Sequence, residues 1–116
     1  MRQYSDFSPF FPSNEIKAGI SLKPFPYFPP EDRKRLAISL KLDPKQLVIP
    51  LQVHSDNVRI CTKPKVKKNT DGVVTNKQDL VLSIQVADCI PIFLVDPVEK
   101  VFGIIHAGWR GVVCGI

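Results

Sequence analysis

Residues 87–107 read ADCIPIFLVDPVEKVFGIIHA, and this stretch decides the fold class. Residues 90–95 form a nearly continuous apolar run of strand length, and residues 101–105 form a second strand pattern. The segment between them begins with Asp96-Pro97 and predicts a turn, so the two runs are expected to pair as an antiparallel hairpin. If the turn is centred on Pro97 and Val98, opposed residues have numbers that sum to 195.

The sequence just before this hairpin also reads as strands. Apolar residues alternate with polar ones or follow the turn signal Asp71-Gly72, a pattern that indicates strands with one buried face. The expected strands are residues 47–53, 58–62, 73–75 and 80–86.

The first 30 residues hold six of the eleven prolines and five of the seven phenylalanines, which predicts an irregular segment with one short strand at residues 16–22. Pro30-Glu31-Asp32 predicts a helix start, and Asp43-Pro44 ends that helix. Residues 112–116 resemble the first turn of a second helix. The sequence therefore predicts an α/β fold of mixed α+β type. It is expected to be a single domain over residues 1–116, with a mixed, largely antiparallel sheet flanked by helices and a truncated C-terminus.

Composition restricts the class of protein. Of the 116 residues 44% are apolar and 23% are charged, which is typical of globular domains. The chain lacks an apolar stretch of about 18 residues, so no membrane span is expected. It also lacks the apolar core of a secretory signal, so its three cysteines are expected to be thiols in the cytoplasm. Two histidines are too few for a multi-copper cluster within one chain.

The net charge of +5 comes mainly from one segment without acidic residues. Such a segment is either a nucleic-acid patch or a solvated loop. Because no aromatic residue lies between Phe28 and Phe93, a base-stacking platform is missing, and no nucleic-acid partner is expected. The basic residues are Arg59, Lys63, Lys65, Lys67 and Lys68.

Cys89 and the two histidines are the candidate metal ligands. The numbers of Cys89 and His106 sum to 195, so the expected hairpin places them opposite each other with their side chains on one face. His54 follows a neighbouring strand and can supply a third ligand. One cysteine and two histidines with an open fourth position favour catalytic zinc. Copper is the rival ion, but the only methionine is Met1, a poor candidate for the axial ligand.

The loop after the hairpin carries candidate anion ligands. Gly108-Trp109-Arg110-Gly111 precedes the short helical segment, and backbone amides there, together with Arg110, can bind phosphate. A plain strand-to-helix turn is the alternative. Asp88 is a candidate general base or an orienting residue, or else a turn aspartate. Cys61 and Cys114 are interpreted as inert thiols.

Four ordered motifs resemble the YfiH family, also called the laccase-domain or multicopper polyphenol oxidase family. They are Gln52-Val53-His54, residues 71–75 (DGVVT), residues 87–92 (ADCIPI) followed by Asp96, and residues 106–111 (HAGWRG). The resemblance implies a mixed-sheet α/β domain with zinc at His54, Cys89 and His106. It implies phosphorolysis of adenosine, inosine, guanosine and methylthioadenosine, and deamination of adenosine. Gln52 joins residues 108–111 as the expected substrate- and phosphate-binding set, and Asp88, Cys89 and Arg110 form the expected catalytic set.

The resemblance also sets the expected cofactors and partners. Zinc is the expected cofactor with copper as the alternative, inorganic phosphate is the co-substrate, and a purine nucleoside is the substrate. A homodimer is an open alternative to a monomer. Family members are longer than this chain, and their early glycine-rich segment and helical Asn-Arg pair lack a match near residues 20–24 and Asp32-Arg33. A copper-dependent phenol oxidoreductase and an inactive fragment are the alternative functions.

Overall fold

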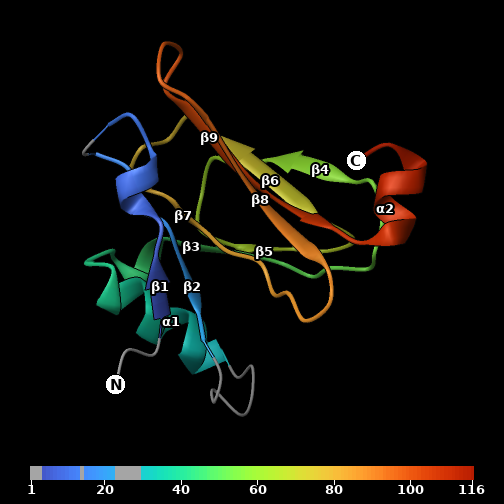
Figure 1. The fold of residues 1–116 in the computed structure, drawn as a ribbon, viewed down its shortest axis with the longest axis horizontal. Helices are drawn as coiled ribbons and strands as arrows, with labels where there is room; N and C mark the ends of the chain where they lie inside the picture. Colours follow the sequence, from blue (N-terminus) through green and yellow to red (C-terminus); the bar gives the residue numbers. More distant parts are fainter. Residues whose placement is uncertain (1–3, 14, 23–29) are drawn as a thin grey trace. The chain divides into compact units, whose positions relative to one another are not determined.

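The structure is a computed structural model that describes residues 4–13, 15–22 and 30–116 (Figure 1). Its contacts divide the chain into two compact units, Met1–Pro44 and Lys45–Ile116, which are described separately below. The single domain over residues 1–116 stays a prediction.

The first unit is small and has one short sheet. Strand β1 (Tyr4–Asp6) pairs antiparallel with β2 (Gly19–Ser21), and the 3-10 turn η1 (Ser8–Phe10) lies between them in the chain. Helix α1 (Pro30–Ser39) begins at the predicted proline. The expected strand at residues 16–22 and the start of the helix are therefore confirmed. The expectation of one strand in this segment is wrong, because β1 pairs with β2, and the helix ends at Ser39, before the predicted Asp43.

The second unit contains two sheets and the short helix α2 (Trp109–Cys114). The 3-10 turn η2 (Pro44–Gln46) lies in the chain where the first unit ends and the second begins. The three-stranded sheet has the order β5-β3-β7, all parallel, and the four-stranded sheet has the order β4-β6-β9-β8, in which only β4 and β6 are parallel. A mixed α+β fold is thus confirmed, but the strands do not form one largely antiparallel sheet as expected, because β3 pairs in parallel with both of its neighbours in a separate sheet. The strands are β3 (Leu47–Pro50), β4 (Val58–Ile60), β5 (Val66–Lys67), β6 (Gly72–Thr75), β7 (Val81–Leu82), β8 (Ile90–Asp96) and β9 (Val101–Ala107).

The predicted hairpin forms, but its register differs from the predicted one. Asp96 pairs with Val101, and Pro91 pairs with His106, so opposed residues have numbers that sum to 197. The predicted sum of 195 is wrong because the loop holds four residues, 97–100, and is centred one position later. Lys100 ends this loop at a φ of 56°, a conformation that the sequence did not suggest.

One face of the four-stranded sheet forms part of the hydrophobic core. Val73 and Ile104 from its central strands are buried together with Val48 from β3, and Leu80 and Cys61 complete the cluster. Burial raises the pKa of the Cys61 thiol, which agrees with its interpretation as an inert core residue.

Two segments differ from the sequence prediction. Only Val81–Leu82 of the expected strand at residues 80–86 pairs with a neighbour, whereas the basic segment contributes β5, which pairs with β3. Among the residues that the structure describes, no helix has the length and apolarity that crossing a bilayer requires.

Candidate metal centre

His54, Cys89 and His106 come together at one end of the four-stranded sheet. His106 lies on β9, Cys89 lies directly before β8, and His54 lies in the loop after β3. One ligand atom from each residue lies within 4.8 Å of the others, and the two imidazole rings meet edge to face with centroids 5.2 Å apart. His106 is buried, Cys89 is half-buried and His54 is exposed, so the group opens to solvent on the His54 side.

Cys89 reaches His106 although the two residues are not directly opposed. In the observed register Pro91 opposes His106, and Cys89 precedes Pro91 by two residues. Because alternate residues of a strand point to the same face, an error of two positions leaves the side chain of Cys89 on the side of His106. The predicted juxtaposition is found, with a diagonal contact in place of a direct one.

Gly108 lies against all three candidate ligands. A Cβ atom at this position would lie 3.1 Å from Cys89 Sγ, 3.3 Å from His54 Cδ2 and 4.0 Å from His106 Cε1. The backbone of Gly108 is extended (φ −85°, ψ 168°), so any residue could adopt its conformation. Glycine is therefore favoured at position 108 because a side chain would crowd the candidate ligands, and not because the backbone conformation requires it.

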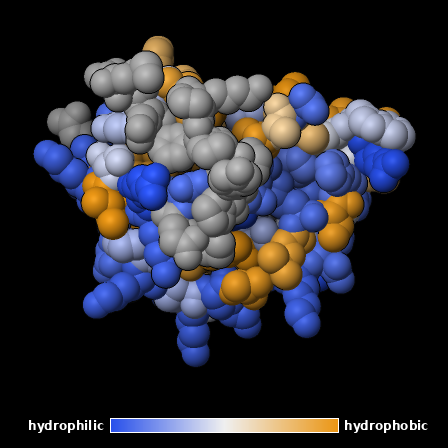
Figure 2. All heavy atoms as spheres, turned by 90° about the horizontal axis from the view of Figure 1, so that it is seen from below, coloured by the Kyte–Doolittle hydropathy of each residue, from blue (hydrophilic) through white to orange (hydrophobic). Residues whose placement is uncertain are grey.

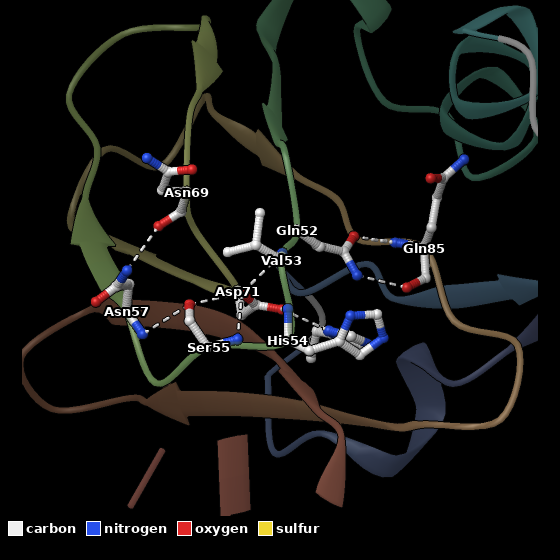
Figure 3. A network of polar contacts seen from close by, with 9 residues as sticks. Gln52, Val53, His54, Ser55, Asn57, Asn69, Asp71 and Gln85 are labelled. Atoms are coloured by element: carbon white, nitrogen blue, oxygen red, sulfur yellow. Dashed lines mark hydrogen bonds and ion pairs between the residues drawn. The ribbon is translucent and has the colours of Figure 1, made fainter. Parts of the chain in front are cut away.

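Asp71 connects the His54 loop to the sheet (Figure 3). Its carboxylate accepts hydrogen bonds from the backbone N–H groups of Val53 (3.1 Å), His54 (3.0 Å) and Ser55 (2.9 Å), and from Ser55 Oγ (2.7 Å). His54 has a φ of 63°, in the left-handed region that is unfavourable for residues other than glycine. The three consecutive N–H bonds hold the loop in this strained conformation.

Asp71 also contacts the second histidine. Its Oδ2 lies 2.7 Å from His106 Nδ1, and both side chains are buried. With Nδ1 bound to a carboxylate, Nε2 is the nitrogen left to bind an ion, as in other carboxylate–histidine pairs. Burial by itself would raise the pKa of Asp71, but the hydrogen bonds from His106, Ser55 and Val53 outweigh it and lower the pKa from 3.8 to about 2.

We expect the free energy of unfolding of the metal-free protein to decrease as the pH is lowered from about 4 towards 2. The folded pKa of Asp71 lies below the ordinary value, so its stabilising contribution is present above pH 4 and is lost as the carboxylate becomes protonated. Urea unfolding across this pH range measures the effect. Ser55→Ala, which removes one hydrogen bond to the carboxylate, should make the decrease shallower; an equal decrease in both proteins would contradict the assignment to Asp71.

The other predicted site residues have different surroundings. The side-chain amide of Gln52 makes two hydrogen bonds to the backbone of Gln85. Its Nε2 donates to the Gln85 carbonyl oxygen (2.7 Å), and its Oε1 accepts from the Gln85 N–H (2.6 Å), so in this conformation Gln52 joins two chain segments. Asp88 is exposed in the bend before β8. The Arg110 guanidinium lies over the exposed ring of Trp109, 5.2 Å from its centroid. Gly111 packs against the loop of His54, where a Cβ atom would lie 2.7 Å from the Ser55 oxygen.

The sequence prediction missed Asp71 as a site residue. Asp71-Gly72 was interpreted as a turn signal, whereas Asp71 is fully buried and directly precedes β6. The position of Asp71 beside His106 follows from the pairing of β6 with β9. Gly72 opposes Ile105, and the backbone N–H of His106 donates to the backbone carbonyl oxygen of Asp71 (2.7 Å). The same register therefore places Asp71 beside His106. A predicted β6–β9 pairing would have found it.

The chain is similar to several known proteins. Residues 30–116 match the family model of the multi-copper polyphenol oxidoreductase laccase. The chain is 34% identical over 108 residues to "Purine nucleoside phosphorylase SCO2081" of Streptomyces coelicolor, covering 90% of this chain and 45% of that protein. It is 35% identical over 91 residues to "Adenosine deaminase RL5" of an unknown prokaryotic organism, covering 70% of this chain and 35% of that protein.

A solved structure shares the fold. The hypothetical protein YfiH of Bacillus licheniformis superposes with a TM-score of 0.70 at 35% identity, covering 75% of this chain and 36% of that one. The chain thus spans less than half of the length of each of these relatives.

Proposed function

Because the chain belongs to the multi-copper polyphenol oxidoreductase laccase family, we propose that it forms the metal-binding part of a zinc-dependent purine nucleoside phosphorylase that also deaminates adenosine. The observation that carries the proposal is the convergence of one thiol and two imidazoles within 4.8 Å. The names of two relatives, a purine nucleoside phosphorylase and an adenosine deaminase, support the two reactions.

The donor set fits zinc. Zinc is bound in catalytic sites by three protein ligands that include thiolate and imidazole, at about 2.3 Å for sulfur and about 2.0 Å for nitrogen. Tetrahedral ligands at these distances are about 3.5 Å apart, so the three side chains need only a small adjustment from their observed separation. When bound, zinc would supply Lewis-acid chemistry to an oxygen of the reacting molecules. His54, Cys89 and His106 would hold the ion, and Asp71 would keep the His106 ring in the required tautomer.

The remaining residues would bind the substrates. In phosphorolysis a phosphate oxygen bonds to the ribose C1′ while the C1′–N9 bond breaks and the leaving purine takes up a proton. Arg110 is exposed and carries the charge that phosphate requires, and Trp109 offers an exposed ring beside it. Helix α2 has only six residues, so its dipole adds little and phosphate binding depends mainly on Arg110. Asp88, next to Cys89, would relay the proton.

The test is an assay with inosine and inorganic phosphate, with and without a metal chelator. We expect formation of hypoxanthine and ribose 1-phosphate that stops with chelator and returns with zinc. Guanosine, adenosine and methylthioadenosine then define the substrate range, and conversion of adenosine to inosine reports deamination. A folded, zinc-loaded chain that performs neither reaction would reject this proposal and leave the two alternatives, a copper-dependent phenol oxidoreductase and an inactive fragment.

A copper-dependent phenol oxidoreductase is the second candidate, because the matching family is described as a multi-copper laccase. The chain has two histidines, both of them in the group described above, so at most one such copper can be bound there. This candidate predicts a thiolate-to-copper absorption band in the visible range and oxidation of phenols by the copper-loaded protein. Absence of both would exclude it.

Replacing Gly108 by alanine is expected to weaken zinc binding about tenfold while changing stability little. The added methyl group would contact Cys89 Sγ and His54 Cδ2 and push these ligands away from the ion. Competition with a chelating dye measures the affinity, and urea unfolding measures the stability. Gly115→Ala is the matched control: Gly115 has a φ of 98°, and a Cβ atom there would meet nothing within 4 Å, so this variant should lose stability and keep its affinity for zinc. Equal affinities for Gly108→Ala and the unchanged protein would contradict the proposed site.

A further inference from the structure

Gln52 uses its side-chain amide differently from a polar residue that faces water. On the face shown in Figure 2 many hydrophilic side chains lie at the surface, where water can bind them. Gln52 is half-buried instead, and both ends of its amide bind the backbone of one residue, Gln85, as Figure 3 shows. A primary amide presents a donor and an acceptor side by side, so this side chain takes the place of a backbone partner for Gln85.

Pro50 interrupts the backbone pairing that would otherwise hold the segment of Gln85. The parallel pairing of β7 with β3 ends at Leu82. The N–H groups of Ile49 and Leu51 donate to the chain at and beside β5, over 3.0 and 2.7 Å. Alternate residues of a strand direct their N–H groups to opposite neighbours, so position 50 faces the side of β7, where proline has no N–H to donate. Past this point the side chain of Gln52 binds the segment that continues from β7.

The contact between Gln52 and Gln85 links the chain segments of two candidate metal ligands. Gln52 precedes His54 by two residues, and Gln85 precedes Cys89 by four. On the other side of Cys89, Ile90 pairs with β9. Cys89 thus lies between a paired strand and a segment that Gln52 fastens to the chain just before His54.

We propose that Gln52 is a positioning residue of the metal centre, which holds the segment of Cys89 at the distance from His54 that a shared ion requires. The ligand atoms lie within 4.8 Å of one another, and this separation depends on how the two segments are joined. Residues whose hydrogen bonds orient metal ligands typically change metal affinity by about tenfold to a hundredfold. The proposal rests on the proposed zinc site but not on the reaction, and it differs from the substrate contact that the family resemblance implies for Gln52.

Gln52→Met tests the proposal, because methionine keeps the length of the side chain and removes both hydrogen bonds. We expect the affinity for zinc, measured by competition with a chelating dye, to fall about tenfold. Cobalt in place of zinc gives a second signal, since a thiolate-to-cobalt absorption band reports ligation by Cys89. This band should be weaker per bound cobalt ion in Gln52→Met, an effect that a general loss of stability would not produce.

Ser83→Ala is the matched control. Ser83 Oγ donates to the carbonyl oxygen of Val48 (2.8 Å), so it fastens the same segment to β3 at a greater distance along the chain from Cys89. This variant should lose stability in urea and keep both the affinity for zinc and the cobalt band. Equal loss of zinc affinity in the two variants, or an unchanged affinity in Gln52→Met, would overturn the proposal. An unchanged affinity with a raised KM for inosine would in addition assign Gln52 to the substrate.

Hydrogen exchange in the unsubstituted chain gives a test that does not depend on the folding of a variant. Coupling is reciprocal, so zinc should stabilise the hydrogen bonds of Gln85 if these favour zinc binding. Zinc is expected to slow exchange of the Gln85 N–H at least tenfold. Exchange of the Lys77 N–H, which donates to Thr75 Oγ1 (3.0 Å) in an exposed loop, should stay unchanged. Unchanged exchange at Gln85 would overturn the proposal.

The same measurements separate this proposal from the proposed function. A chain that binds zinc and shows the expected effects of Gln52→Met, but does not convert inosine, would refute the reaction and leave the role of Gln52 intact. A chain that converts inosine with zinc, and whose zinc affinity does not respond to Gln52→Met, would refute only the role of Gln52. A chain that binds no zinc would overturn both.

Discussion

Cys89→Ala is expected to abolish zinc binding, so that the purified protein falls from about one zinc ion per chain to none after dialysis. Cys89 supplies the only thiolate of the three candidate ligands, and two imidazoles alone leave the ion with too few protein ligands for a stable site. Elemental analysis of the dialysed protein measures the effect. The inosine phosphorolysis that depends on zinc should disappear with the metal.

The other two cysteines provide matched controls for this substitution. Cys114 is exposed on α2, and Cys61 lies in the core, so neither is a candidate ligand. Cys114→Ala should keep its zinc and its stability, whereas Cys61→Ala should lose some stability and keep its zinc. An unchanged zinc content in Cys89→Ala would reject the proposed site.

Asp71→Asn is expected to weaken zinc binding between tenfold and a hundredfold and to lower the free energy of unfolding by about 3 kcal/mol. Both carboxylate oxygens accept hydrogen bonds, Oδ1 from Val53 and Ser55 and Oδ2 from His54 and His106. An asparagine amide has one acceptor oxygen, so its NH₂ group would face N–H donors on one side and leave them unsatisfied in a buried position. One substitution would thus loosen the His54 loop and the His106 ring together.

Two measurements separate the positioning role of Asp71 from a purely structural one. Chelator competition gives the zinc affinity, and nitrogen NMR of the imidazole ring reports which nitrogen of His106 carries the proton, which should change in Asp71→Asn. Ser55→Ala is the control, because it removes the 2.7 Å hydrogen bond to Asp71 and the 3.2 Å bond from the Asn57 N–H without touching His106; it should cost about 1 kcal/mol of stability and keep the affinity for zinc. An Asp71→Asn protein with unchanged zinc affinity would show that Asp71 only stabilises the loop.

The candidate ligands could be predicted from the sequence because the conclusion depended on the alternation of side chains, not on the register itself. The predicted pairing of Cys89 with His106 was wrong by two residues, yet both side chains face the same side of the sheet. An error of one residue would have placed Cys89 on the opposite face. The length of the loop decides the register of the hairpin. The sequence Asp-Pro-Val-Glu-Lys does not indicate a four-residue loop with Lys100 in the left-handed region.

The sequence by itself determined most of the strands, the hairpin, the face on which Cys89 and His106 lie, and the family, because these depend on residue type and spacing within short segments. Only the tertiary structure decided the role of Asp71 and the hydrogen bonding of Gln52 to Gln85. Each of these depends on which strands become neighbours in space. Asp71 and His106 are 35 residues apart in the chain, and such a contact follows from sheet order, which local patterns do not encode.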